Sequence, residues 1–414
     1  MKKRTFLILF FVTSLFGYSQ IKALYNQSVE AYKSKDYPLF LKLNKQMDSI
    51  RPSHPTVSYN LAAAYSLNKM HAEAIAALQR LIVMNNATAF EEDADFEFIK
   101  ASTDYKKLVA LKATQNNEIA TSVEKLTLSE KDLHPESVLY LEKQKLWLAS
   151  SIRNKKIVTF DSKGVCTDWF TDVLYSVFAL KADWSQKYLW VSTSAMPVMK
   201  GFTKEMDGQN QILKIEISSK KVVKSYSMQG KHVFGDLVVA RNGDIYISDS
   251  VEPLIYKIAD DKLFLWKDLK GEAFNLQGLT FNNDESKLFV ADYLKGVCVI
   301  SMKDTSSSWL QFPEGTTKKG IDGLVHHKNT LIAVQNGSVP IRIVKYQLNT
   351  DNNQIVGFTV LDNNREIFNE PALATVSKGK LYFFANSPWK FYNAQNELDL
   401  TKFENPKLFE LQLD

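Results

Sequence analysis

Six polar residues recur at matched positions, each at the start of a short run of β-branched and aromatic residues. They are Glu136, Ser176, Asp236, Gln277, Asp322 and Glu370. Four are carboxylates, which repel one another at close range unless a proton or a cation intervenes. Oxygen donors suit a hard divalent ion, Ca²⁺ first, with Mg²⁺, Mn²⁺ and Zn²⁺ as alternatives. Taken singly, each residue could instead cap a strand or satisfy backbone groups in a turn.

The elements that must position these residues are pairs of strand-like runs. The six starts are separated by 40, 60, 41, 45 and 48 residues. That spacing is typical of four-stranded propeller blades. Third runs follow every pair, and fourth runs follow in repeats two to five. We therefore predict a mainly β protein, a six-bladed β-propeller over residues 119–414 with the six polar residues lining its central channel. An open sandwich would not explain six matched starts.

The sixth repeat reaches Asp414, the last residue, after its third strand. Residues 120–128 are strand-like and precede the first repeat. We expect this segment to supply the outer strand of blade six, which would close the ring and cover an open edge.

Residues 20–118 have a helical pattern instead. Ala31-Tyr32 and Ala64-Tyr65 lie 33 residues apart, each in a helix–turn–helix pattern. This is close to the tetratricopeptide period of about 34 residues, and a third, irregular unit covers residues 96–111. We predict tetratricopeptide-like repeats here, with a protein or peptide as their partner.

Residues 1–19 are typical of a signal peptide. A basic start, Lys2 to Arg4, precedes an apolar run from Thr5 to Phe16, with a cut expected after Ser19. We expect an exported protein, periplasmic or secreted, with no membrane span once the signal is removed. An uncleaved anchor is the alternative.

The charge balance argues against a nucleic-acid partner. The formal charge is +5, but three basic residues lie in the signal segment, which leaves 48 basic against 46 acidic residues. The two cysteines, Cys166 and Cys298, fall in different repeats, so two free thiols are expected.

Over about 119–414 the chain resembles the gluconolactonase-like propellers, which include senescence marker protein and luciferin-regenerating enzyme. The resemblance rests on three short motifs: His134-Pro135-Glu136, Leu276-Gln277-Gly278-Leu279 and Ile321-Asp322-Gly323-Leu324. It implies a divalent metal ion at the channel mouth held by Glu136, Gln277 and Asp322. Gln277 stands where that family has Asn. Asp236 stands where the family often has a substrate-contacting Asn.

The resemblance further implies hydrolysis of sugar lactones or related esters. The metal would polarise the carbonyl, with Asp322 or Asp236 as general base. Expected contacts to a small polar ligand at the channel mouth are Asp236, Glu370, Gln335, Asn336, Asn386 and Trp389.

Two alternatives stay open. One is a non-catalytic scaffold that binds partners through the helical repeats and the propeller. The other is a strictosidine-synthase-like propeller with Glu370 as a metal-independent base. Among the histidines, His232 is a candidate to contact the residues of the site without binding the metal ion itself. His326 and His327 are adjacent in a strand and face opposite sides, so they make a poor metal pair.

Overall fold

The computed structural model describes residues 12–413, and the chain divides after Asn116 into two compact units. Residues 315–317 group with the first unit. Most of the predicted signal peptide, including Lys2 to Arg4, lies outside the described residues. In residues 12–413, no helix is both long enough and apolar enough to cross a membrane.

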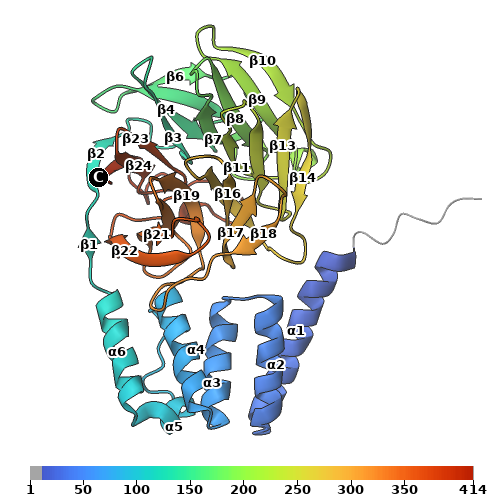
Figure 1. The fold of residues 1–414 in the computed structure, drawn as a ribbon, viewed down its shortest axis with the longest axis vertical. Coiled ribbons are helices and arrows are strands. Elements are labelled where there is room, and N and C mark those ends of the chain that lie inside the picture. Colours follow the sequence, from blue (N-terminus) through green and yellow to red (C-terminus); the bar gives the residue numbers. More distant parts are fainter. Residues whose placement is uncertain (1–11, 414) are drawn as a thin grey trace, which may run out of the picture. The chain divides into compact units, whose positions relative to one another are not determined.

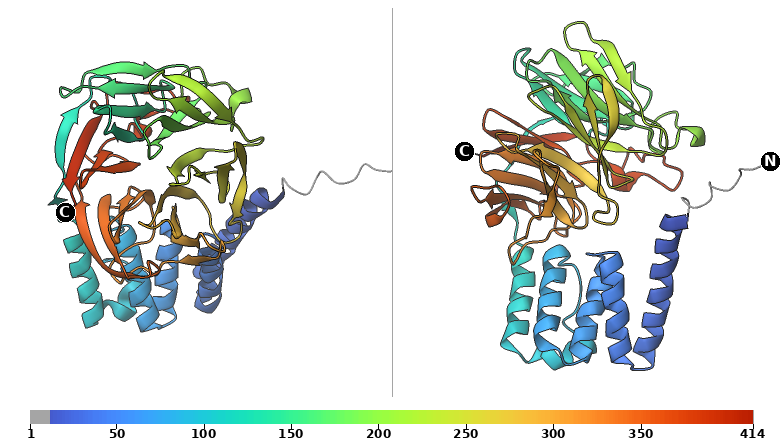
Figure 2. Two further views of the ribbon diagram at one scale, coloured as in Figure 1. Left: turned by 45° about the horizontal axis from the view of Figure 1, so that its top comes forward. Right: turned by 45° about the vertical axis from the view of Figure 1, so that its right-hand side comes forward.

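The first unit consists of helices that lie side by side (Figures 1 and 2). They are α1 (Val12–Lys33), α2 (Tyr37–Ile50), α3 (Pro55–Leu67), α4 (His71–Met84), α5 (Glu97–Lys100) and α6 (Thr103–Gln115), with a 3-10 turn, η1 (Ala94–Phe96). Asp36 caps α2 by accepting a hydrogen bond from the Leu39 amide at 3.1 Å. Short turns join α1 to α2 and α3 to α4 as helical hairpins.

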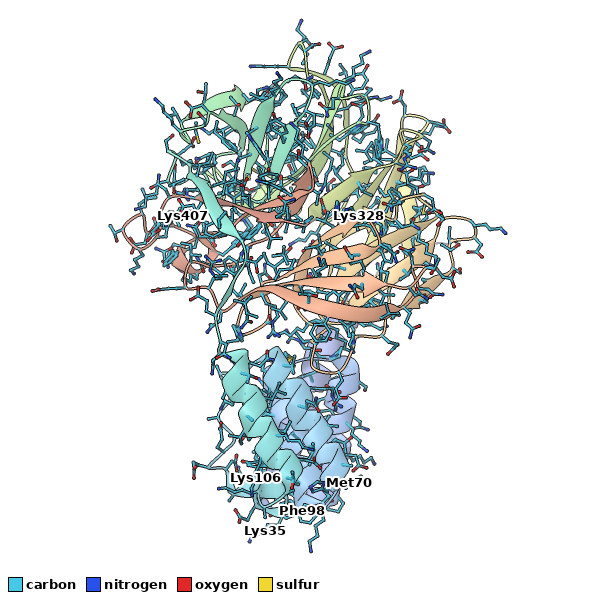
Figure 3. All side chains as sticks on the ribbon, turned by 60° about the vertical axis from the view of Figure 1, so that its left-hand side comes forward. Lys35, Met70, Phe98, Lys106, Lys328 and Lys407 are labelled. Atoms are coloured by element: carbon cyan, nitrogen blue, oxygen red, sulfur yellow. The ribbon has the colours of Figure 1, made fainter. Side chains whose placement is uncertain are left out.

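The core of this unit depends on small residues. Ala62, Ala63 and Ala64 are all buried, which lets α3 approach its neighbours closely. Phe96 and Ile99, from the irregular third segment, are fully buried in the same core. Phe98, labelled in Figure 3, is 47% exposed.

The second unit contains six sheets of four strands, one of them extended by a fifth strand. From the inner strand outward, blade one is β3 (Val138–Leu141), β4 (Leu146–Ser151), β5 (Lys156–Phe160) and β6 (Cys166–Phe170), and blade two is β7 (Ser176–Ala182), β8 (Tyr188–Ser194), β9 (Asn210–Glu216) and β10 (Lys221–Tyr226). Blade three is β11 (Phe234–Val239), β12 (Ile245–Asp249), β13 (Leu254–Ala259) and β14 (Lys262–Asp268), and blade four is β15 (Leu276–Phe281), β16 (Lys287–Asp292), β17 (Gly296–Ser301) and β18 (Ser307–Trp309). Blade five is β19 (Ile321–His327), β20 (Thr330–Gln335), β21 (Arg342–Leu348) and β22 (Ile355–Asn363), and blade six is β23 (Ala374–Ser377), β24 (Lys380–Phe384), β25 (Lys407–Gln412) and β2 (Val123–Thr127).

The six inner strands form a closed ring. Each contacts the next in the order β3, β7, β11, β15, β19 and β23, and β23 returns to β3. Figure 2 shows the blades arranged around this ring. The six-bladed propeller predicted from the repeat spacing is therefore confirmed. Cys166 and Cys298 are free thiols, as expected.

The ring is closed by the segment that precedes blade one. β2 pairs antiparallel with β25 and forms the outer strand of blade six. Lys407, labelled in Figure 3, begins β25 and pairs with Thr127. The prediction that residues 120–128 act as one strand is wrong at its start, because Ile119–Ala120 form β1 on the edge of β22 in blade five. Asp362 accounts for the break: its Oδ1 accepts the amides of Thr121 and Ser122 at 2.9 and 3.1 Å, which holds the chain between the two blades.

Leu128 should be the residue of this closing segment that matters most for stability. It is fully buried among side chains of blades one and six, whereas Val123 on β2 is 58% exposed. Leu128→Ala should lower the free energy of unfolding by about 2–5 kcal/mol in urea titrations. Val123→Ala, the matched control, should change it by about 0.5 kcal/mol or less. Equal effects of the two substitutions would contradict the buried closure described here.

Candidate channel site

One cavity of about 360 Å³ gathers side chains from all six blades. Five of the six predicted channel residues line it, together with Asn336 and Trp389. The lining consists of Glu136, Phe178, Met196, Val233, Gly235, Asp236, Ser250, Gln277, Gly278, Tyr293, Asp322, Asn336, Glu370, Leu373 and Trp389. Residues more than 200 positions apart in the chain therefore share one small space, whose volume is in the range of small-molecule sites.

β-Bulges at the starts of the inner strands determine the direction in which these side chains point. In blades two, four and five, two inner-strand residues stand where the neighbouring strand has one. The first of the two bulged residues is Phe178 in blade two, Gln277 in blade four and Asp322 in blade five, and each of them lines the cavity. A bulge leaves its residues outside the regular ladder and redirects their side chains. The same structural position thus holds an aromatic ring, an amide and a carboxylate in three blades.

The strand pairing in blade three shows that Asp236 does not occupy the position that the sequence repeat gave it. Leu237 pairs with Ile247 in blade three, and Leu279 pairs with Val290 at the equivalent position of blade four. Asp236, the residue before Leu237, is therefore equivalent to Gly278 rather than to Gln277. A Cβ on Gly278 would lie 2.6 Å from Asp322 O in the next blade, so this position faces a neighbouring strand. Asp236 makes the corresponding contact between blades three and four, where its Oδ2 accepts the Leu279 amide at 3.2 Å.

Asp236 is therefore already engaged. Its Oδ1 accepts the Leu237 amide at 2.8 Å and lies 3.7 Å from Lys181 Nζ, and the residue is 2% exposed. Burial raises the pKa of the Asp236 carboxyl, and Lys181 and the two amides oppose that shift. A carboxylate held by three donors is a poor general base, so the geometry favours Asp322 of the two candidates.

Asp322 ends a short chain of hydrogen bonds. Tyr293 Oη donates to Asn336 Oδ1 at 2.9 Å, and Asn336 Nδ2 donates to Asp322 Oδ2 at 2.5 Å. Burial raises the pKa of Asp322 to about 7, helped by the charges of Glu370 and Asp236 and opposed by the Asn336 bond. A carboxylate with a pKa near neutrality is well matched to accepting a proton from water.

Glu136 and Glu370 present oxygens that nothing satisfies. Glu136 Oε2 and Glu370 Oε2 are buried, with no hydrogen-bond partner among residues 12–413. Burial, then Asp322 and Glu370, hold the pKa of Glu136 well above its usual range. Burial also raises the pKa of Glu370, whose backbone has a φ of 52°, a strained conformation for a residue other than glycine.

These oxygens fit a hard cation in their chemistry. Gln277 Nε2 donates to Asn275, so Gln277 Oε1 is the atom left to coordinate. Glu136, Gln277 and Asp322 would then offer only oxygen ligands. That set consists of two carboxylates and one amide. In the described part of the chain, no group of three or more His, Cys, Asp or Glu side chains is placed so that it could hold a metal ion.

An apolar wall forms another part of the cavity lining. It consists of Phe178, Met196, Val233, Leu373 and Trp389. Phe178, Met196, Val233 and Trp389 belong to one hydrophobic cluster. Trp389 comes from the long connection between β24 and β25. The cavity therefore has both acidic and hydrophobic lining residues.

Four sequence candidates lie outside this cavity. The buried Ser176 precedes the bulge, and Phe178 takes its place. Gln335 is fully buried, and its Nε2 donates to Lys319 O at 3.1 Å. Asn386 accepts the Lys407 amide at 2.8 Å and lines a separate cavity. His326 stacks on Phe289, with ring centroids 6.0 Å apart. The Gln335 and Asn386 side chains thus bond to the backbone of the protein, and contact of either with a ligand stays a prediction.

Tyr293 and Phe178 are site residues that sequence reasoning missed. Tyr293 directly follows the second strand of blade four, and that adjacency is the only signal in the sequence. Phe178 fits a buried strand pattern, and only the bulge shows that its side chain reaches the cavity.

His232 lies next to the cavity-lining Val233. Its Nδ1 is 2.6 Å from Asp249 Oδ2, and its Nε2 is 3.0 Å from Gln229 O. Both partners are acceptors, so the protonated ring satisfies both. The Asp249 bond raises the pKa of His232 against the effect of burial.

The raised pKa of His232 predicts a pH-dependent contribution to stability. A group with a higher pKa in the folded state stabilises fully below its unfolded pKa, about 6.5, and loses that effect as pH rises through the folded value. The difference in unfolding free energy between the wild type and His232→Gln should therefore be largest below about pH 6.5 and shrink as the pH rises above it. Urea titrations at several pH values measure it, and a difference independent of pH would contradict the paired, protonated imidazole.

The strand pairing and the axial cavity define a six-bladed β-propeller with a small-molecule-sized site. No family model and no curated protein matches the sequence. Among solved structures, the chain is similar to virginiamycin B lyase from Staphylococcus aureus, with 15% identity and a TM-score of 0.46, over 66% of this chain and 85% of that one.

Two further structures are similar to a comparable degree. A gluconolactonase from Xanthomonas campestris has 14% identity and a TM-score of 0.46, over 70% of this chain and 89% of that one. A luciferin-regenerating enzyme has 14% identity and a TM-score of 0.45, over 71% and 94%. At these values the likeness goes no further than the fold, which the strand pairing already defines.

Proposed function

We propose that the propeller is a divalent-cation-dependent hydrolase of lactones or related esters. The observation that carries this proposal is the set of buried, mutually repelling carboxylates Glu136, Asp322 and Glu370 around one cavity, two of them with unsatisfied oxygens. Such a set calls for a compensating positive charge. Glu136, Gln277 and Asp322 would hold the ion, Ca²⁺ first. When bound, it would polarise the ester carbonyl.

Asp322 would take the proton of the attacking water. The water oxygen bonds to the carbonyl carbon, the carbon–oxygen bond to the leaving alkoxide breaks, and the proton passes to that alkoxide. A lactone thus becomes a hydroxy acid with no other reactant. Asn336 and Tyr293 would keep the Asp322 carboxylate oriented through their hydrogen-bond chain. Glu370 would contact the polar part of the substrate.

Export and the helical unit belong to the same proposal. The basic and apolar segments of residues 1–19 support a signal peptide, and the 33-residue spacing of Ala31-Tyr32 and Ala64-Tyr65 supports tetratricopeptide-like repeats. Tyr25, Tyr32 and Phe98 are 40%, 41% and 47% exposed on the helical unit. Binding of a protein or peptide partner by these repeats would be a second function.

Cation binding is the first test. The chelator-treated protein should gain thermal stability when Ca²⁺, Mg²⁺, Mn²⁺ or Zn²⁺ is added, by about 2.7 kcal/mol at 100 times the dissociation constant. Asp322→Asn keeps the shape but removes the charge, so the gain should shrink or vanish. Glu205→Gln, an exposed acidic residue away from the cavity, is the matched control and should keep the full gain. If no ion stabilises the wild type, the cation-dependent mechanism is wrong.

Hydrolysis separates the two candidate bases. With the stabilising ion present, Asp322→Asn should lower kcat on a lactone panel by about 100-fold or more. Asp236→Asn should instead lower the melting temperature, because it weakens the bonds to Leu279 and Lys181, and it should lower kcat much less. A pH-stat assay with the melting curve of each variant measures both. The reverse pattern would make Asp236 the base.

A further inference from the structure

The apolar wall supplies five of the fifteen residues that line the cavity. Phe178 is 6% exposed and packs with Ile152 and Val198 behind it, so the wall continues into a hydrophobic cluster. The side chains of Phe178, Met196, Val233 and Leu373 offer no hydrogen-bond donor. A hydroxyl buried against them would lose its water without a replacement partner.

Trp389 is held in a defined place. Its ring packs edge-on against His134 with centroids 4.4 Å apart, and His134 Nδ1 lies 2.8 Å from Tyr392 Oη. Burial lowers the pKa of His134 to about 3, so the imidazole is neutral at ordinary pH. The wall thus has a fixed aromatic face that packs on an uncharged imidazole. A preformed apolar face binds an apolar group without first having to order itself.

The same cavity is also lined by the carboxylates Glu136, Asp236, Asp322 and Glu370. A sugar lactone carries hydroxyl groups around its whole ring and would place some of them against the apolar wall. A lactone or ester with one polar end and one hydrocarbon end would match both kinds of lining residue. We infer that the substrate class is amphipathic: a lactone or ester whose alkyl or aryl substituent lies against Phe178, Met196 and Trp389. This inference rests on the proposed hydrolase function for the reaction, and on the cavity lining for the specificity.

The test is a series of γ-lactones with alkyl chains of increasing length, compared with glucono-δ-lactone, assayed in the presence of the stabilising ion. Each added methylene that reaches the wall should raise kcat/KM by about fourfold, until the cavity is full. Glucono-δ-lactone should be a poor substrate. If it is turned over more efficiently than every alkyl lactone, the amphipathic assignment is overturned while the hydrolase stands.

Substitutions in the wall should act on chain-length dependence rather than on all substrates alike. Met196→Gln is nearly isosteric and should flatten the rise of kcat/KM with chain length, chiefly through KM. Phe178→Leu is a second, conservative variant in case a larger change prevents folding. Trp184→Ala removes a 64% exposed tryptophan outside the cavity and should leave the chain-length dependence unchanged. Equal losses on short and long substrates in both wall variants would overturn the inference.

A binding measurement separates this inference from the reaction. Lactams are not readily hydrolysed, so calorimetry with a hexyl-substituted δ-lactam and a polyhydroxylated δ-lactam reports the wall alone. Tighter binding of the hexyl compound, weakened in Met196→Gln, supports the amphipathic site even if no lactone is turned over, in which case only the hydrolase proposal fails. Preference for the polyhydroxylated lactam overturns the inference.

Discussion

The inner strands of the propeller can converge on one cavity only if the ring is closed, and closure depends on β2 pairing with β25. This contact joins residues nearly 300 positions apart. Beside it, the fully buried Leu128 lies in a core shared by blades one and six, and Asp362 turns the chain between β1 and β2. Because Glu136 enters the cavity from blade one and Glu370 arrives just before blade six, the same junction brings these two carboxylates together.

Bulges then decide what each blade contributes. They place Gln277 and Asp322 at the cavity, and the small residues Gly278 and Gly323 beside them let the next blade's backbone approach closely. In blade three the corresponding position holds Asp236, whose carboxylate bonds the neighbouring blade instead of clashing with it. In blade two the bulge delivers Phe178. One repeated backbone device therefore brings an aromatic ring, an amide and a carboxylate into the same cavity.

The acidic and apolar lining residues together give the cavity its chemical character. Carboxylates that raise one another's pKa favour a bound cation or a shared proton, and a fixed aromatic face favours a hydrocarbon group. Tyr293 and Asn336 supply the hydrogen bonds that orient Asp322 without neutralising it. The proposed hydrolase function and the proposed amphipathic substrate are both inferred from this combination of acidic and apolar residues in one cavity.

Much of this molecule was determined by the sequence alone. The blade spacing predicted six blades, and the strand pattern of residues 120–128 predicted most of the closing strand, because hydrophobic alternation is local and can be counted. Glu136, Gln277, Asp322 and Glu370 were found in the same way. The tertiary structure alone decided which matched residue reaches the cavity, since a one-residue bulge changes the direction of a side chain without changing the hydrophobic pattern. That is why Asp236 became a contact between blades and Phe178 lines the cavity where Ser176 was expected.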